Sequence, residues 1–146
     1  MQSEGIMYLL KLNNKIFRYT QIYFDRVLKE YELSSGSYPY LLILKDKDGI
    51  NQNRISEELG YDKAMTTRTL AKLINIGYLD RIKDDDDSRA NKIYLTEKGK
   101  DVSVKILEKI QGLEQLITLD LNEEEKVVTI ESLNKILCNI KKVNVI

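Results

Sequence analysis

The sequence predicts a mainly α-helical protein in which a single β-hairpin interrupts the helices. Over most of the 146 residues, apolar side chains recur every three or four positions, which is the period of an amphipathic helix. Between residues 78 and 95, two short stretches instead alternate apolar and polar residues on either side of a charged segment, as the strands of a hairpin do. Glycines and helix-capping residues separate these elements along the chain.

The first predicted helix covers residues 5–31. Its apolar side chains follow mixed three- and four-residue steps, and tyrosines widen the apolar face beyond a simple stripe. A helix with such a broad face needs partners on more than one side. It either belongs to the core of one subunit or is shared with a second subunit.

A break, a short helix and a turn are predicted next. Residues 33–37 contain serines and a glycine, and they precede a very apolar stretch, residues 38–45. Pro39 fits the first turn of a helix there, because an N–H at that position has no partner within the helix. A turn over residues 46–49 follows, and Ile50 can add a short strand.

Two further helices are predicted over residues 52–59 and 63–76. Asn51 and Asp62 are suitable N-caps for them, because their side-chain oxygens can accept from free N–H groups of the first turn. Gly77 is suited to end the second helix. Two short helices joined by a three-residue turn that contains glycine are typical of a helix-turn-helix.

The predicted hairpin follows this pair of helices directly. Its strands are residues 78–82 and 92–95, and the loop between them is too long for a two-residue turn and too polar to pack. A helix-turn-helix followed at once by a hairpin predicts a winged helix-turn-helix core, made of three short helices and a β-hairpin wing. This arrangement presents one helix and the wing to DNA.

Two long amphipathic helices complete the chain. The first begins after Thr96 and runs to about Ile117, and the second runs from Asn122 to about Lys142, with Glu125 completing a capping box. These helices and the first one have broad apolar faces and no sheet to cover them. An intertwined homodimer would bury those faces.

We therefore expect one domain over residues 1–146. Within it, residues 34–100 would form the winged helix-turn-helix DNA-binding lobe. Residues 1–33 and 101–146 would form the dimerisation helices that flank it.

The composition argues against catalysis and metal binding. The chain has no histidine and one cysteine, Cys138, which excludes Ser-His-Asp triads, Cys-His dyads and cysteine-based zinc clusters. The Asp84–Asp87 run lacks the alternation and the glycine of a calcium loop. We expect no enzyme, no cofactor and no metal site. An absence of long apolar runs and of a basic leader predicts a cytoplasmic protein with no membrane segment.

The charge balance leaves two functions open. Net charge is zero, so an interaction with DNA must depend on local placement of charge. Apart from Asp84–Asp87, basic residues outnumber acidic ones between residues 34 and 100. The acidic run and the zero net charge favour an alternative, a winged-helix protein interaction module without DNA binding.

The predicted helix over residues 63–76 has one face suited to the major groove. A helical wheel places four side chains on the inner face: Thr66, Thr69, Leu70 and Leu73. The opposite face is small, hydroxylic and basic: Ala64, Thr67, Arg68, Ala71, Lys72 and Asn75. Ala64 and Thr67 can approach bases or a thymine methyl group, Arg68 can bind guanine or phosphate, and Lys72 can meet phosphate.

The tip of the hairpin supplies further candidate contacts. Arg89 can enter a narrow minor groove, where negative potential is concentrated. Ser88 can donate to a phosphate. Asn91 and Lys92 lie beside them at the start of the returning strand.

Residues 63–99 resemble the DNA-binding core of the MarR family of bacterial transcription regulators. The matching residues are Asp62-Lys63, Thr67-Arg68, Leu73, Gly77, Arg81, Asp87-x-Arg89 and Leu95-Thr96-Glu97-Lys98-Gly99. The order of elements and the Leu121-to-Glu125 entry to the last helix extend the resemblance over essentially the full chain.

The resemblance implies a homodimeric repressor that binds a pseudo-palindromic operator in double-stranded DNA. Half-sites about 34 Å apart would match its two lobes. It also implies that Arg89 enters the minor groove and that Asp87 orients it. The residues that it assigns to the recognition helix are Lys63, Thr66, Thr67, Arg68 and Lys72.

Release by a small aromatic or lipophilic effector is a further implication of the resemblance. Five residues could line a pocket for such a ligand: Arg18, Tyr19, Tyr23, Tyr38 and Tyr40. Ordinary packing at the core and its rim is the alternative role for these tyrosines.

Overall fold

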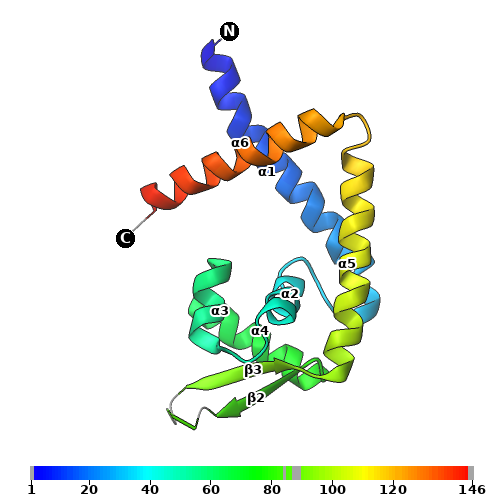
Figure 1. The fold of residues 1–146 in the computed structure, drawn as a ribbon, viewed down its shortest axis with the longest axis vertical. Helices are drawn as coiled ribbons and strands as arrows, with labels where there is room; N and C mark the ends of the chain where they lie inside the picture. Colours follow the sequence, from blue (N-terminus) through cyan, green and yellow to red (C-terminus); the bar gives the residue numbers. More distant parts are fainter. Residues whose placement is uncertain (1, 84, 87–89, 145–146) are drawn as a thin grey trace. The chain divides into compact units, whose positions relative to one another are not determined.

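The computed structural model describes residues 2–83, 85–86 and 90–144, and confirms a mainly helical winged fold (Figure 1). Its elements, in order, are α1 (Gln2–Val27), the short 3-10 helix η1 (Lys29–Tyr31), α2 (Tyr38–Asp46), β1 (Ile50–Asn51), α3 (Gln52–Leu59), α4 (Lys63–Ile76), β2 (Leu79–Lys83), β3 (Asn91–Leu95), α5 (Glu97–Ile117) and α6 (Glu123–Val143). The chain divides into two compact units, residues 1–107 and 108–146, with the division inside α5. The division by role into a DNA-binding lobe and dimerisation helices stays a prediction.

The helix-turn-helix consists of α3 and α4. The Asn51 side chain accepts from the Asn53 N–H at 2.8 Å, and the Asp62 side chain accepts from the Met65 N–H at 3.0 Å. Gly60 ends α3 with φ of 69°, a left-handed conformation that costs glycine little because it has no Cβ. Both predicted N-caps and the start and end of both helices are confirmed.

The sheet is antiparallel, with strand order β1-β3-β2. Leu79 on β2 pairs with Leu95 on β3, and both side chains are buried, as is Ile93. The predicted first strand began at Tyr78, whereas β2 begins one residue later. Tyr78 is not part of the strand, because its N–H donates to the Leu73 carbonyl at 3.0 Å and so belongs to the end of α4.

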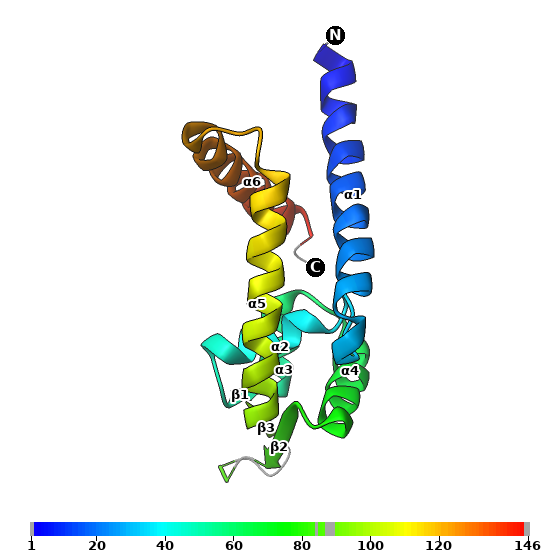
Figure 2. The same ribbon diagram turned by 90° about the vertical axis from the view of Figure 1, so that its right-hand side faces the viewer.

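The core of the first unit lies between the short helices and the sheet (Figure 2). Its fully buried hydrophobic side chains are Leu28, Tyr40, Leu41, Leu44, Ile55, Leu70, Leu73, Leu79, Ile93 and Ile106. They come from the residue that follows α1, from α2 to α4, from the sheet and from the first half of α5. α4 and the β2–β3 hairpin therefore rest on one shared core.

α1 ends at Val27, four residues earlier than predicted. The chain continues as η1, and Glu32 takes a left-handed conformation with φ of 58°. The Leu33 N–H donates back to the Leu28 carbonyl at 3.1 Å, which turns the chain toward α2. Leu28 and Leu33 are buried, so apolar spacing continues past the end of the α-helix itself.

Large apolar side chains remain exposed on α1. Among the described residues they are Met7, Tyr8, Leu9, Leu10, Leu12, Ile16, Phe17, Tyr19 and Ile22. The last turn of α1 differs, because Phe24 is buried there. Most of the apolar surface of α1 is thus left uncovered within the first unit.

The second unit has the same property. α6 begins with the predicted capping box, in which the Asn122 side chain accepts from the Glu125 N–H and the Glu125 side chain accepts from the Asn122 N–H. Its exposed apolar residues are Val127, Val128, Ile130, Leu133, Ile136, Leu137, Ile140 and Val143. None of the helices in the described part of the chain is both long and apolar enough to cross a bilayer.

Candidate nucleic-acid interface

α4 turns a polar and basic face to solvent. Leu70 and Leu73 anchor the helix in the core, and the opposite side chains are exposed: Lys63, Ala64, Thr67, Arg68, Ala71, Lys72 and Asn75. The predicted division of this helix into two faces is confirmed. In the N-terminal turn, Ala64 is small and exposed, so the helix backbone is accessible at that position.

Thr66 is an exception among the predicted contacts. Its side chain is only 1% exposed, and its Oγ1 lies 3.1 Å from the hydroxyl of buried Tyr40. The prediction that Thr66 binds DNA is wrong, because its hydroxyl faces the core and joins α4 to α2. Tyr40 is itself fully buried, and its place in a ligand pocket stays a prediction.

Replacing Tyr40 by phenylalanine is expected to lower the free energy of unfolding by about 1 to 3 kcal/mol, because the Thr66 hydroxyl would lose its partner in the core. The double substitution Tyr40→Phe/Thr66→Val removes both polar groups. It should cost less than the sum of the two single substitutions. Urea unfolding of the three variants measures this coupling, and strictly additive losses would contradict it.

α3 contributes to the same surface through one side chain that the sequence did not point to. The Nε2 of Gln52 donates to the Oγ1 of Thr67 at 3.1 Å. The two residues lie 15 positions apart, so no local pattern could have indicated the contact. It joins the first residue of α3 to the exposed face of α4.

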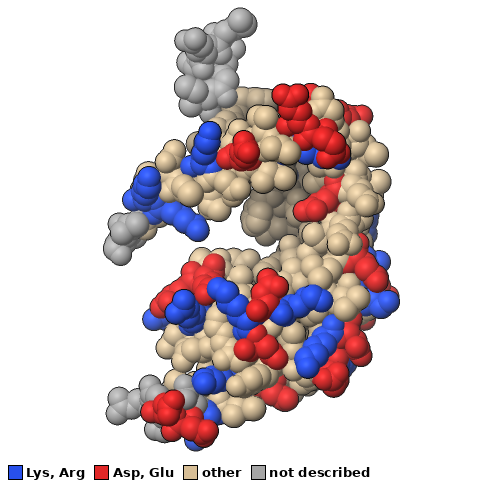
Figure 3. Space-filling view, viewed as in Figure 1, with Lys and Arg blue, Asp and Glu red and all other residues tan. Residues whose placement is uncertain are grey.

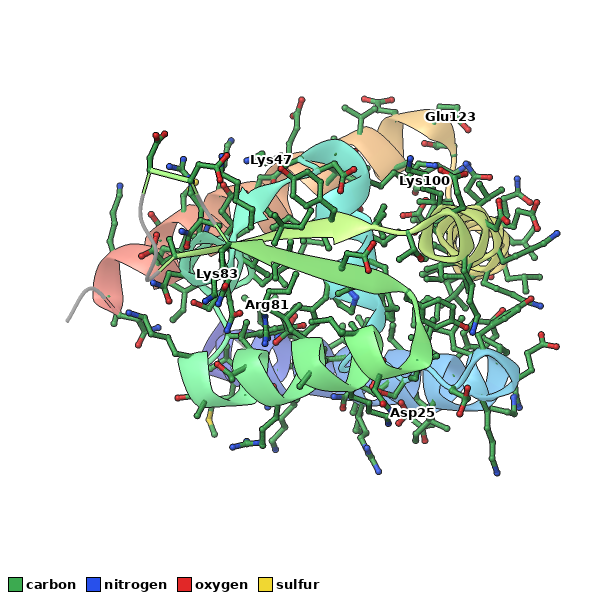
Figure 4. The ribbon with its side chains drawn as sticks, turned by 90° about the horizontal axis from the view of Figure 1, so that it is seen from below. Asp25, Lys47, Arg81, Lys83, Lys100 and Glu123 are labelled. Atoms are coloured by element: carbon green, nitrogen blue, oxygen red, sulfur yellow. The ribbon has the colours of Figure 1, made fainter. Side chains whose placement is uncertain are left out.

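β2 adds two basic residues beside α4. Leu79, Arg81 and Lys83 share one face of the strand, because side chains alternate. Leu79 is buried in the core, whereas Arg81 and Lys83 are exposed. In Figure 4 they project from β2 on the side where α4 lies. Neither Arg81 nor Lys83 was among the predicted contacts. The alternation of side chains along this strand could have indicated that both share a face.

The wing is described in part. Three predicted residues, Asp87, Ser88 and Arg89, lie outside the described residues. Asn91 and Lys92 are half-buried on β3, where they pair with Lys83 and Ile82.

Charge on the surface is mixed. Asp85 and Asp86 are exposed beyond β2. On the face drawn in Figure 3, described basic and acidic side chains are interspersed rather than gathered into one area. The basic residues of α4 and β2 are therefore a local feature and do not reflect a globally basic protein.

The predicted effector residues are only partly brought together. Tyr23 and Tyr38 both contact Phe24, with ring centroids 5.3 Å and 4.8 Å from its centroid. Burial, followed by the nearby Tyr61, raises the pKa of the Tyr38 phenol above its ordinary value. Arg18 and Tyr19 are exposed on α1. Within the described residues, no group of acidic or cysteine side chains is arranged to hold a metal ion.

Comparison with known proteins identifies the family. The MarR family profile matches residues 33–90. The regulator BilQ of Clostridioides difficile is 35% identical over 102 residues, covering 70% of this chain and 67% of that protein. The chain belongs to the MarR family. It is accordingly a DNA-binding transcriptional regulator with a helix-turn-helix, from a family of regulators rather than enzymes.

Solved structures of MarR proteins agree with this fold. A MarR transcriptional regulator from Methanosarcina mazei Go1 superposes with a TM-score of 0.88 at 30% identity, over 94% of this chain and 99% of that one. The MepR–DNA complex of S. aureus gives a TM-score of 0.83 at 24% identity, over 88% and 96%. The resemblance inferred from the sequence is therefore confirmed.

Proposed function

We propose that this MarR protein is a homodimeric repressor that binds a pseudo-palindromic operator in double-stranded DNA. The observation that carries the proposal is the exposed face of α4, where Thr67, Arg68 and Lys72 stand on a helix that is capped, buried on its other side and preceded by a tight turn. α4 would enter the major groove, and Arg68 would read a guanine or clamp a phosphate. Such a protein would act in the cytoplasm, with the chromosome.

The wing would add contacts to this interface. Arg89 would enter the minor groove, with Asp87 orienting it. Ser88, Asn91 and Lys92 would approach the backbone. We add Arg81 and Lys83 on β2 to the proposed phosphate contacts. At the start of α4, Lys63 would also lie near the DNA, and Ala64 would approach a base or a thymine methyl group.

Dimerisation is supported by the uncovered apolar surface of α1 and of α6. Monomers rarely expose contiguous apolar surface on this scale, and a second copy of the chain would cover it. A twofold dimer would place two copies of α4 on the operator, with half-sites about 34 Å apart. Release by a small aromatic or lipophilic effector completes the proposal. The aromatic cluster of Tyr23, Phe24 and Tyr38 supports it, with Arg18 and Tyr19 nearby on α1.

Binding of the DNA upstream of the protein's own gene tests this function. In an anisotropy titration at several salt concentrations, the logarithm of the association constant should fall linearly with the logarithm of salt concentration, by about 0.9 for each phosphate contacted. Weak binding that does not change with salt would instead favour the protein interaction module.

Arg68→Ala is expected to lower operator affinity by about 1 to 3 kcal/mol and to weaken the preference for operator over unrelated DNA, because a bidentate contact to a base would be lost. Lys72→Ala is the matched control on the same helix. It should weaken binding to all sequences alike and reduce the salt slope by about one. If wild type and Arg68→Ala preferred operator over unrelated DNA by the same factor, a residue other than Arg68 would make the base-specific contact.

A further inference from the structure

Gln52 reaches across the helix-turn-helix to the centre of the proposed reading surface. Its Nε2 donates to Thr67 Oγ1 at 3.1 Å, and the Thr67 hydroxyl donates to the Lys63 carbonyl at 3.0 Å. Both contacts involve the same oxygen of Thr67. They connect the first turn of α3 with the first two turns of α4.

The hydrogen bonds that Thr67 makes within the protein limit the contacts that its side chain can make with DNA. A hydroxyl carries a single hydrogen, and here the Lys63 carbonyl takes it. One acceptor position is taken by Gln52. Thr67 therefore has no hydroxyl hydrogen left to donate to a base or a phosphate. What it retains in full is its methyl group.

Gln52 also limits the conformations of Thr67. In an α-helix, threonine divides between two χ1 rotamers, since its hydroxyl can bond to a carbonyl one turn back. The Gln52 amide favours the rotamer in which Oγ1 lies between α3 and α4. With the oxygen held there, the methyl group has one position.

The amide of Gln52 has the orientation that this role requires. Because Thr67 can only accept from Gln52, the amide nitrogen must face Thr67 and the carbonyl must face away. Gln52 Oε1 is buried and accepts no hydrogen bond from any residue that the structure describes. The hydrogen bond to Thr67 is therefore the contact that fixes the orientation of this amide.

We propose that Gln52 is a positioning residue for base recognition: it holds Thr67 so that the methyl group, and not the hydroxyl, meets the DNA and selects the 5-methyl group of a thymine. Apolar contact with this methyl group is one way in which the major groove distinguishes thymine from other bases. The inference depends on the proposed operator binding. It assigns a role to a residue of α3 that need not touch DNA itself.

Uracil substitution in the DNA tests the inference, because uracil lacks only the 5-methyl group. A duplex selected from a random pool by the wild-type protein is prepared with each thymine replaced singly by deoxyuridine. At one thymine in each half-site, wild type should lose affinity about fourfold, the factor expected for one buried methyl group. Gln52→Ala should reduce this loss toward none while the salt slope remains that of wild type.

Two substitutions of Thr67 separate the methyl group from the hydroxyl. Thr67→Ser keeps the hydrogen bonds and removes the methyl group, so the deoxyuridine penalty should vanish. Thr67→Val keeps a methyl group and has one strongly preferred rotamer in a helix without help from Gln52. The double variant Gln52→Ala/Thr67→Val should therefore recover the penalty that Gln52→Ala loses. A merely structural role for Gln52 predicts no such recovery.

Asn53→Ala is the control on the same turn of α3, and it should leave the deoxyuridine penalty unchanged. The proposal is overturned if no thymine of the selected duplex gives a penalty, or if the penalty in Gln52→Ala equals that in wild type. Failure of wild type to bind any duplex in a salt-dependent way would overturn the proposed function as well. Thermal unfolding of each variant shows whether the fold is retained.

Discussion

Replacing Gly99 by alanine is expected to lower the free energy of unfolding by about 3 kcal/mol, the upper part of the range for overpacking a core. A Cβ at this position would lie 2.1 Å from the Tyr78 carbonyl oxygen and 3.1 Å from Leu95 Cδ2. The first of these atoms belongs to the backbone. It cannot rotate away as the end of a side chain could.

The Tyr78 carbonyl is also held in place by other bonds. It accepts from the Thr96 N–H at 3.1 Å, where β3 passes into α5. The Thr96 hydroxyl donates to the Gly77 carbonyl at 2.6 Å and accepts from the Gly99 N–H at 3.0 Å. A shift of the carbonyl would disturb this junction, which joins the end of α4 to the wing and to α5. We therefore expect Gly99→Ala to weaken DNA binding along with stability.

Gly112→Ala is the matched control, because it makes the same change in the same helix. An added Cβ at Gly112 meets no atom within 4 Å among the described residues. Alanine should stabilise the helix there by about 0.5 to 1 kcal/mol, since it loses less backbone entropy than glycine on folding. Urea unfolding followed by circular dichroism, at one fixed protein concentration, compares the two variants. Similar effects at both positions would contradict the role assigned to the Tyr78 contact.

Local features of this fold could be predicted well, because they depend on residues close in sequence. Asn51 and Asp62 cap helices through bonds to N–H groups two or three residues away, and Gly77 ends α4 with φ of 95°. The end of α1 was predicted less well. Leu28 and Tyr31 continue the apolar spacing while the backbone has already passed into η1.

The candidate site was harder to predict, because it depends on contacts between residues that are far apart in the sequence. Thr66 was assigned to DNA through the family resemblance, yet its hydroxyl contacts Tyr40, which lies 26 residues earlier. The helical wheel alone placed it on the inner face, and that placement is correct. Gln52 was missed because its partner is on the next helix. Spacing predicts faces of single helices, but it does not predict which side chains meet between them.

A charge introduced on the apolar face of α6 is expected to separate the proposed dimer. Leu133, Ile130 and Leu137 are exposed by 51%, 61% and 47%, although all three are aliphatic. Leu133→Lys would place an ammonium group without a partner in the interface that we propose for this face. The cost of burying it should raise the dimer dissociation constant at least about 100-fold. Operator affinity should fall with it by about 100-fold or more, because the two half-sites would no longer be bound by one linked pair.

Glu131→Lys is the control for this substitution. It introduces the same residue on the same helix, but about 160° away around the helix axis, given about 100° per residue. Sedimentation velocity should show Glu131→Lys and wild type as dimers at micromolar concentration, and Leu133→Lys as the 17.0 kDa chain. A wild-type protein that sediments as a monomer would refute the dimer. A Leu133→Lys variant that stays dimeric would exclude this face of α6 from the interface and leave the exposed face of α1 as the surface to test.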